Sequence, residues 1–432
     1  MFLGRHVLEK FRVNKQQYQL FKSGPVDTLL GIIAIALVLV CVTRLRARDG
    51  DSPVAADDSP YNSGLKTIVR QSVDLYKLRA LLVQVEQNGR TIYSAALGDS
   101  MTEVPASLRM HFRNGAVAFS YISTILLELV DQKWRGVTLD SKLSEYLPEL
   151  PLSSSITLRN LANMTSGYAD YVYQPEVMRS LYQDPFRQWT ADELIQIGTS
   201  ADRMFDPGKN WGYSHTNYVI LGRVLEKITG MPLDQAMCKF VFEPLGLKQT
   251  RGFSTPVIPR PALHSFSSER REALMIPPDV PFYEETTYWN PSWTTAAGAV
   301  QTTDINDVST TIEAVGTGRL LSRASSAEQL GPRLIGFGHK QDGCDACREN
   351  TYAFNYGLGI VNIGPWITET KDFAGNSATV GYLPSHKLSV AVVTTYLASA
   401  YDDKGNGKNA SIPVFAALGN ALVANSIPNT SK

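Results

Sequence analysis

The chain has little net charge, little repetition and few cysteines. Its 41 lysines and arginines balance 41 aspartates and glutamates over 432 residues. A nucleic-acid binder needs a concentrated basic surface, so this balance argues against nucleic acid as a partner. No low-complexity tract and no clear internal repeat is present. The composition is that of an ordinary globular protein, long enough to bury a large core.

Two of the four cysteines, Cys344 and Cys347, form a C-x-x-C pair in a polar stretch that reads as a loop. A zinc site would need two further ligands, and only His339 is close in sequence. A redox motif would normally open a helix after a strand, which is missing here. We therefore favour a local disulfide, which would agree with an oxidising compartment. A free thiol pair and metal or redox use stay open as alternatives, and no cofactor is expected.

Long apolar runs are also scarce, and the most marked one lies near the N-terminus. Thr28 to Thr43 carries no charge. About 16 helical residues span roughly 24 Å, against a hydrocarbon core of about 30 Å. Pro25 and Val26 would lengthen the helix, so we expect a single transmembrane anchor over residues 25–43, with the membrane as its partner. The alternatives are a signal-peptide core and a buried helix.

Charges beside this run indicate how it would lie in a membrane. A short basic segment, residues 1–24, precedes it, and a polar linker, residues 44–62, follows it. The basic bias favours an N-terminus inside and a main domain on the far side. That side would be the mitochondrial intermembrane space, from the inner membrane, or the bacterial cell envelope.

The main domain, residues 63–427, contains a series of short ordered blocks. A loop-like segment over residues 112–119 is followed by an apolar helix, expected from Ser120 to Lys133. Asn88-Gly89 lies between two alternating runs and predicts a type I′ hairpin. The later blocks are Val137-Thr-Leu-Asp140, Leu143–Leu150, Ile156–Leu161, Met164-Thr-Ser-Gly167, Phe205-Asp-Pro-Gly208, Trp211–Tyr218, Phe242–Gly246 and Asn290-Pro-Ser-Trp293.

Together these blocks resemble the serine β-lactamase-like and penicillin-binding-protein-like hydrolases. That family includes class C β-lactamases, D-Ala-D-Ala carboxypeptidases and the mitochondrial lactamase-like protein. The resemblance implies an α/β (α+β) fold, in which an antiparallel sheet built from both chain ends is flanked by helices. It also implies a mostly helical insert over about 137–290 and a cleft where the two parts meet.

The departures from the family pattern fall on its catalytic positions. In Ser-x-x-Lys the serine attacks a carbonyl and the lysine helps to remove its proton. Ala116 stands at the serine position and Phe119 at the lysine position. The second motif, Tyr-x-Asn, reads Tyr213-Ser-His215. The third, Lys/His-x-Gly, is best matched by Phe373-Ala-Gly375.

Other residues offer weaker sites. Ser120 lies one position past Phe119 and is expected to be an ordinary helix residue. Ser63-Gly-Leu-Lys66 matches Ser-x-x-Lys literally, but it lies at the edge of the linker. Gly316-Thr-Gly318 reads as a turn after a helix. We therefore expect no functional catalytic residue of the family type.

The sequence thus predicts a membrane-anchored, catalytically inactive member of the family. Its expected role is an accessory or structural subunit of a membrane-associated assembly, with protein partners. Two alternatives stay open. One is a module that binds a peptide or acyl ligand without turning it over. The other is an enzyme rewired around Tyr213 and His215, because histidine has a suitable pKa for acid–base work.

Overall fold

The computed structural model describes residues 62–252, 255–295, 301–331 and 334–428. The chain divides into two units, residues 1–52 and 53–432, and the second contains every described residue. The predicted basic segment, the predicted anchor and nearly all of the predicted linker lie outside the described residues. In the part that the structure describes, no helix is long and apolar enough to cross a membrane.

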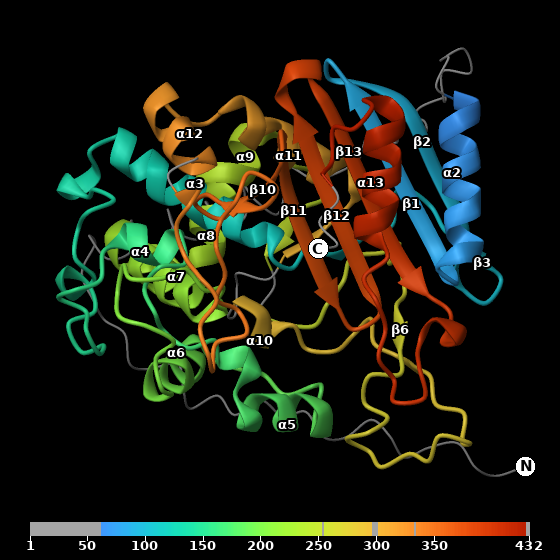
Figure 1. The fold of residues 1–432 in the computed structure, drawn as a ribbon, viewed down its shortest axis with the longest axis horizontal. Coiled ribbons are helices and arrows are strands. Elements are labelled where there is room, and N and C mark those ends of the chain that lie inside the picture. The colour runs from blue at the N-terminus through green and yellow to red at the C-terminus, as the bar shows by residue number, and fades with distance from the viewer. Residues whose placement is uncertain (1–61, 253–254, 296–300, 332–333, 429–432) are drawn as a thin grey trace, which may run out of the picture. The chain divides into compact units, whose positions relative to one another are not determined.

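An eight-stranded antiparallel sheet runs through the domain (Figure 1), in the order β3-β2-β1-β13-β12-β11-β10-β9. Strands from the two chain ends pair where β1 meets β13, as predicted. The bounds are β1 (Leu78–Gln87), β2 (Arg90–Met101), β3 (Val104–Pro105), β9 (Asn355–Tyr356), β10 (Val361–Ile363), β11 (Trp366–Phe373), β12 (Asn376–Leu383) and β13 (Leu388–Tyr396).

The β1–β2 hairpin turns at Asn88-Gly89. Both residues have positive φ, 53° and 70°. A type I′ turn needs positive φ at both central positions, and Asn-Gly supplies it at the lowest strain. The predicted hairpin is therefore confirmed, with β2 running on to Met101.

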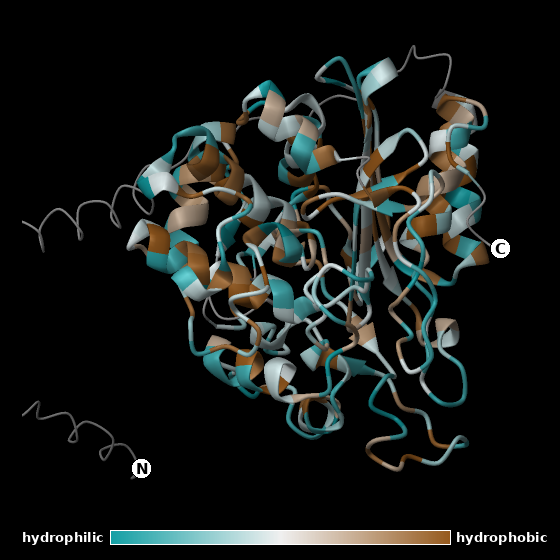
Figure 2. Ribbon diagram, turned by 60° about the vertical axis from the view of Figure 1, so that its left-hand side comes forward, coloured by the Kyte–Doolittle hydropathy of each residue, from teal (hydrophilic) through white to brown (hydrophobic). Residues whose placement is uncertain are grey.

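Two helices from the ends of the domain cover one face of the sheet: α2 (Asn62–Leu75) and α13 (Ser411–Leu422). Leu65 and Val69 of α2 and Phe415 of α13 are buried in one apolar cluster with β1 and β13. Figure 2 shows the apolar residues that these helices carry.

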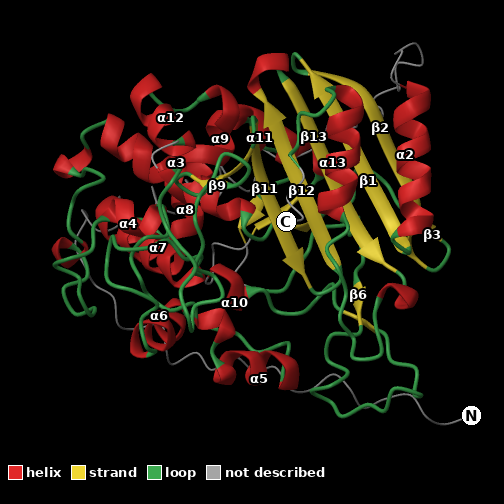
Figure 3. Ribbon diagram, in the orientation of Figure 1, coloured by secondary structure: helices red, strands yellow, loops and turns green. Residues whose placement is uncertain are grey.

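The other face carries α11 (Ile305–Thr317) against β12 and β13, and beyond it the helical region (Figure 3). The central helix of that region, α3 (Val117–Asp131), begins at Val117 rather than at Ser120 and is buried along nearly its whole length. The remaining helices are α4 (Leu158–Ala162), α5 (Pro175–Gln183), α6 (Ala191–Ser200), α7 (His215–Thr229), α8 (Leu233–Met237), α9 (Glu243–Leu245), α10 (Ser292–Thr295) and α12 (Arg323–Leu330).

Short strands connect the helical region to the sheet. β4 (Phe112–Arg113) and β5 (Arg251–Gly252) both pair with β8 (Gln301–Thr303), and β6 (Phe266–Ser267) pairs with β7 (Glu284–Glu285). β4 leads directly into the N-terminus of α3, where the family's first motif would lie. The fold therefore brings the N-terminus of α3, the start of α7 and strand β11 together.

Candidate functional site

The N-terminus of α3 presents a methyl group where a nucleophile would be needed. Ala116 is the N-cap, partly exposed, and makes no side-chain cap hydrogen bond. Gly115 has φ of 53°, and a Cβ atom on it would lie 2.9 Å from Cβ of Lys371. The side chain of Lys371 therefore lies directly on the loop before Ala116, in the space beside the helix N-terminus.

One turn further along α3, Phe119 fills the position of the family's lysine. It is 1% exposed and stacks on Tyr218, with ring centroids 4.1 Å apart and planes 14° from parallel. Its ring also lies 6.0 Å from that of Tyr213 and 5.8 Å from that of His215. Such aromatic contacts stabilise by about 0.5–1.5 kcal/mol each beyond the burial of area. Phe119 is thus a packed core residue that joins α3 to α7.

The second motif lies where α7 begins. Ser214 is the N-cap, and His215 is the first residue of the helix. Nδ1 of His215 lies 2.9 Å from Oδ2 of Asp170, whose other oxygen accepts a hydrogen bond from the backbone of Val172. Among the described residues, neither Nε2 of His215 nor the hydroxyl of Tyr213 has a hydrogen-bond partner, and both side chains are partly exposed. Asp170 was not expected from the sequence.

Tyr213 is poorly suited to act as a base. Burial, followed by the charge of Glu369, holds its pKa well above the ordinary value of 10.0. A base must be deprotonated near the working pH, so this phenol stays protonated and is available only as a donor.

The residues predicted at the third motif lie at the end of β11 and in the turn after it. Phe373, the last residue of β11, stacks on Trp293 at 5.7 Å in a separate small cluster with Trp289. It does not join the rings around Phe119. Gly375 has φ of 79° in the turn after β11, where any Cβ would collide with the backbone of Phe266. Gly375 is therefore required by the geometry of this turn.

Glu369 is the residue of β11 whose charge acts on Tyr213. Side chains two apart on a strand share a face, so Glu369, Lys371 and Phe373 point to the same side, and all three are buried. One oxygen of Glu369 has no partner among the described residues. Burial raises the pKa of Glu369 well above its ordinary value of 4.5. An acid thus lies beside Tyr213, where the family motif places a cation.

Lys371 is equally unusual. It is 3% exposed, and its Nζ donates to Oδ1 of Asn376. Burial, with a smaller contribution from the charge of Arg113, lowers its pKa to about 7. Sequence reasoning missed both Glu369 and Lys371. The available signal was that Glu369 and Lys371 share the strand face of the apolar residues Ile367 and Phe373, which places both charged residues on a buried face.

The remaining candidate residues lie away from this site or are used for structure. Ser120 is buried, and its hydroxyl donates to the backbone of Val117 at 2.6 Å. Ser63 and Lys66 lie on α2, on the opposite face of the sheet. Gly318 is the C-cap of α11. Cys344 and Cys347 are joined by a disulfide.

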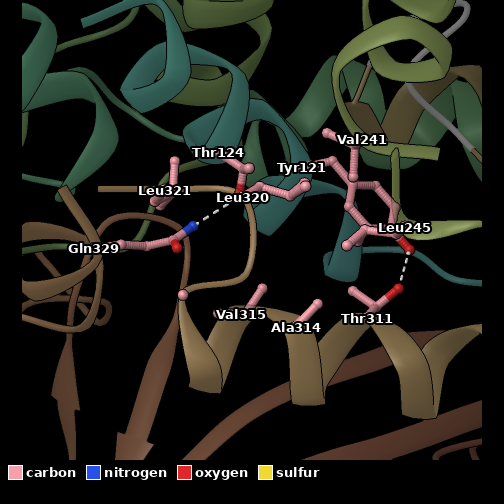
Figure 4. Close-up of a pocket in the computed structure, with 11 residues that line it drawn as sticks. Tyr121, Thr124, Val241, Leu245, Thr311, Ala314, Val315, Leu320, Leu321 and Gln329 are labelled. Carbon is pink, nitrogen blue, oxygen red and sulfur yellow. Dashed lines mark hydrogen bonds between the residues drawn. The ribbon is translucent and has the colours of Figure 1, made fainter. Parts of the chain in front are cut away.

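Two small cavities lie among the described residues. One cavity, of about 10 Å³, lies between α3 and α11 and is lined by Tyr121, Thr124, Gln329 and aliphatic side chains (Figure 4). Another of about 10 Å³ lies beside Arg113 and Asn376. Each has room for about one water molecule, and neither includes Tyr213 or His215.

A family model described as Beta-lactamase matches residues 65–412. The chain belongs to the β-lactamase family. Its curated relatives include penicillin-binding protein 4* of Bacillus subtilis, 30% identical over 33% of this chain and 30% of that protein. A D-aminopeptidase of Brucella anthropi is 26% identical over 43% of this chain and 35% of that protein. The matches span only about a third of the length of these two relatives.

Solved structures share the fold of this β-lactamase-family chain, and they align over a larger share of it than the relatives above. D-amino acid amidase from Ochrobactrum anthropi SV3, complexed with D-phenylalanine, aligns with a TM-score of 0.69 at 19% identity, covering 85% of this chain and 100% of that one. A D-stereospecific amidohydrolase from Streptomyces aligns with a TM-score of 0.66 at 20% identity, covering 82% and 98%. At these identities the likeness concerns the fold alone.

Proposed function

We propose that this β-lactamase-family protein is not a serine hydrolase, and that it works as a membrane-anchored accessory or structural subunit. The observation that carries the proposal is the packing of Phe119. Its ring stacks on Tyr218 and contacts Tyr213 and His215 at the position of the family's lysine, one turn after an alanine. Loss of such catalytic groups leaves only a residual rate, on the order of 10³–10⁴ over water in a well-built site.

Two further contacts support an inactive site. Lys371 lies against Gly115, the residue before Ala116, so its side chain crowds the loop at the start of α3. Burial raises the pKa of Glu369 well above its ordinary value, so this buried acid offers no positive charge to hold a substrate carboxylate. Replacing catalytic polar groups with packed rings favours stability over function, as expected of a protein selected as a scaffold.

The membrane part of the proposal rests on the uncharged run from Thr28 to Thr43. Attached to a membrane through residues 25–43, the domain would meet partners at the membrane surface on the far side from the N-terminus. The role would then be positioning within an assembly rather than turnover.

The role is tested by the native size of the full-length protein, extracted from its own membranes with a mild detergent. We expect it to migrate with defined companion proteins, well above the size of one chain. The control is a variant lacking residues 1–43, which should lose the companions if assembly needs the membrane. Migration as a single chain without companions would contradict the accessory role.

A second candidate function is a hydrolytic or ligand-binding site rewired around His215. The contact that favours it is the 2.9 Å pair of His215 and Asp170, because a carboxylate-oriented imidazole is the base of many nucleophilic sites. Hydrolysis of a chromogenic ester that disappears in His215→Ala, and persists in His386→Ala at the exposed 3₁₀ turn after β12, would favour this candidate.

A further inference from the structure

Arg113 is a buried guanidinium and Lys371 a buried amine, and no described carboxylate pairs with either of them. Arg113 is 4% exposed and Lys371 is 3% exposed. No described carboxylate lies within ion-pair distance of either, whereas buried charges are nearly always paired or neutralised. The two side chains are close enough for the charge of Arg113 to lower the pKa of Lys371.

The hydrogen bonds of Arg113 and Lys371 go to neutral acceptors, which do not balance a positive charge. Nη1 of Arg113 donates to the carbonyl of Val257 at 3.1 Å, and Nη2 donates to that of Pro256. Nε of Arg113 is buried and has no acceptor among the described residues. Lys371 donates only to the amide oxygen of Asn376, which carries no charge.

The acids nearest to Arg113 and Lys371 do not form ion pairs with them. Asp372 acts on Lys371 electrostatically, but its side chain points to the other face of β11, where it accepts a hydrogen bond from Ser377. Glu369 shares the face of Lys371, and no ion pair joins the two. The phenol of Tyr288 is the titratable group whose charge would act on Arg113.

A small cavity lies beside these groups. Its volume is about 10 Å³, which is about one water-sized probe. Its polar lining comes from Arg113, Asn376, Ser265 and Thr287, so the guanidinium, an amide and two hydroxyls can donate to whatever fills it. The remaining walls are apolar: Phe112, Ile258, Leu263 and Phe373.

We propose that this cavity between β4 and β12 is a binding site for a small monovalent anion of the chloride class. A cavity with donors, apolar walls and a buried unpaired guanidinium fits a single compact negative charge. The anion would supply the counter-charge that the side chains lack, and so join the loop before α3 to β11 and β12. The site is independent of the proposed accessory role.

The test uses the full-length protein in a mild detergent, with bromide as the probe. Ionic strength is held constant by exchanging sodium bromide for sodium gluconate, because gluconate is too large for the cavity. We expect a saturable rise of about 1–3 °C in the melting midpoint with bromide. Crystals grown in bromide should show an anomalous peak beside Nε of Arg113.

The variant Asn376→Asp keeps the test decisive even if changes at Arg113 prevent folding. It places a carboxylate next to Lys371 and in the cavity wall, so it should fold and lose the bromide response. Asn88→Asp in the β1–β2 turn carries the same change of charge at an exposed place and should keep the response. A bromide-free cavity holding water, or an equal bromide response in Asn376→Asp and the wild type, would overturn the proposal.

Discussion

In the proposed inactive site, Ala116 and Phe119 would remove different parts of the same chemistry. Ala116 removes the nucleophile without disturbing the helix start, because its side chain is small and partly exposed. Phe119 removes the base and adds a ring to the core. Reversing the change at position 116 should cost little stability, whereas reversing the change at position 119 would remove a ring that packs between α3 and α7.

Restoring the first motif should therefore cost stability without restoring activity. Ala116→Ser with Phe119→Lys exchanges a ring stacked on Tyr218 for a buried ammonium group. We expect a loss of about 3 kcal/mol or more in the free energy of unfolding, measured by denaturant melts. Ala116→Ser alone should stay within about 0.5 kcal/mol of the wild type. Appreciable hydrolysis of a chromogenic cephalosporin by the double variant would mean that the cleft is open.

Glu369 should make the protein less stable as the pH rises. Its pKa is raised by burial above 4.5, so the folded state holds a proton that the unfolded state releases. Stability is then greatest below pH 4.5 and falls as the pH rises from there towards the folded-state pKa. Glu369→Gln cannot ionise. Above about pH 5 the advantage of Glu369→Gln over the wild type should grow with pH, by at most about 1.4 kcal/mol per pH unit, until the folded-state pKa is reached. Parallel stability curves for the two proteins would show that Glu369 is already ionised in the fold.

The first motif could be assigned to Ala116 and Phe119 from the sequence, because both lie in one contiguous segment at the start of α3. The third motif is harder to assign from the sequence. That position depends on which residues of β11 face α7, and thus on the register of β11 against β12. A one-residue shift in register exchanges the two faces of a strand. Phe373 was therefore assigned to the third motif from the position of Gly375, and not from the strand itself.

The elements that were predicted best have strong local signals. The Asn-Gly turn and the apolar run of β13, Leu388–Tyr396, each carry a strong local signal for their own structure. The pairing of β13 with β1 depends on contacts more than 300 residues apart in the chain. It was available only through the resemblance to the family.

Packing of α13 on the sheet requires a glycine on β12. A Cβ on Gly381 would collide with the ring of Phe415, a buried residue of α13. We expect Gly381→Ala to lower stability by about 1–3 kcal/mol in thermal or denaturant melts. Gly64→Ala in α2 has no atom within 4 Å of the new methyl group and should be neutral or slightly stabilising. An equally harmless Gly381→Ala would mean that α13 is free to shift on the sheet.

For the whole molecule, membrane attachment is expected to depend on the N-terminal region and not on the domain. The uncharged run lies before residue 62, and no described helix suits a membrane. The full-length protein should stay in the membrane pellet after carbonate extraction, and deletion of residues 1–43 should release it. Release of the full-length protein by carbonate would contradict the anchor.

The family and the fold of residues 65–412 follow from the ordered blocks, and the family match agrees with them. The partner does not follow from the sequence in the same way, because a docking surface is a set of side chains brought together by folding. Folding brings distant residues together in the same way at Arg113 and Lys371, which are 258 positions apart in the chain.

The central claim is that this β-lactamase fold has no working nucleophile and no open cleft. It is tested most directly by intact-mass spectrometry of the full-length protein after incubation with a fluorescent penicillin and, separately, with a fluorophosphonate. We predict an unchanged mass with both reagents, while an active serine hydrolase of the same family is labelled stoichiometrically under the same conditions. A stoichiometric mass increase that maps to any serine of this chain would contradict the account.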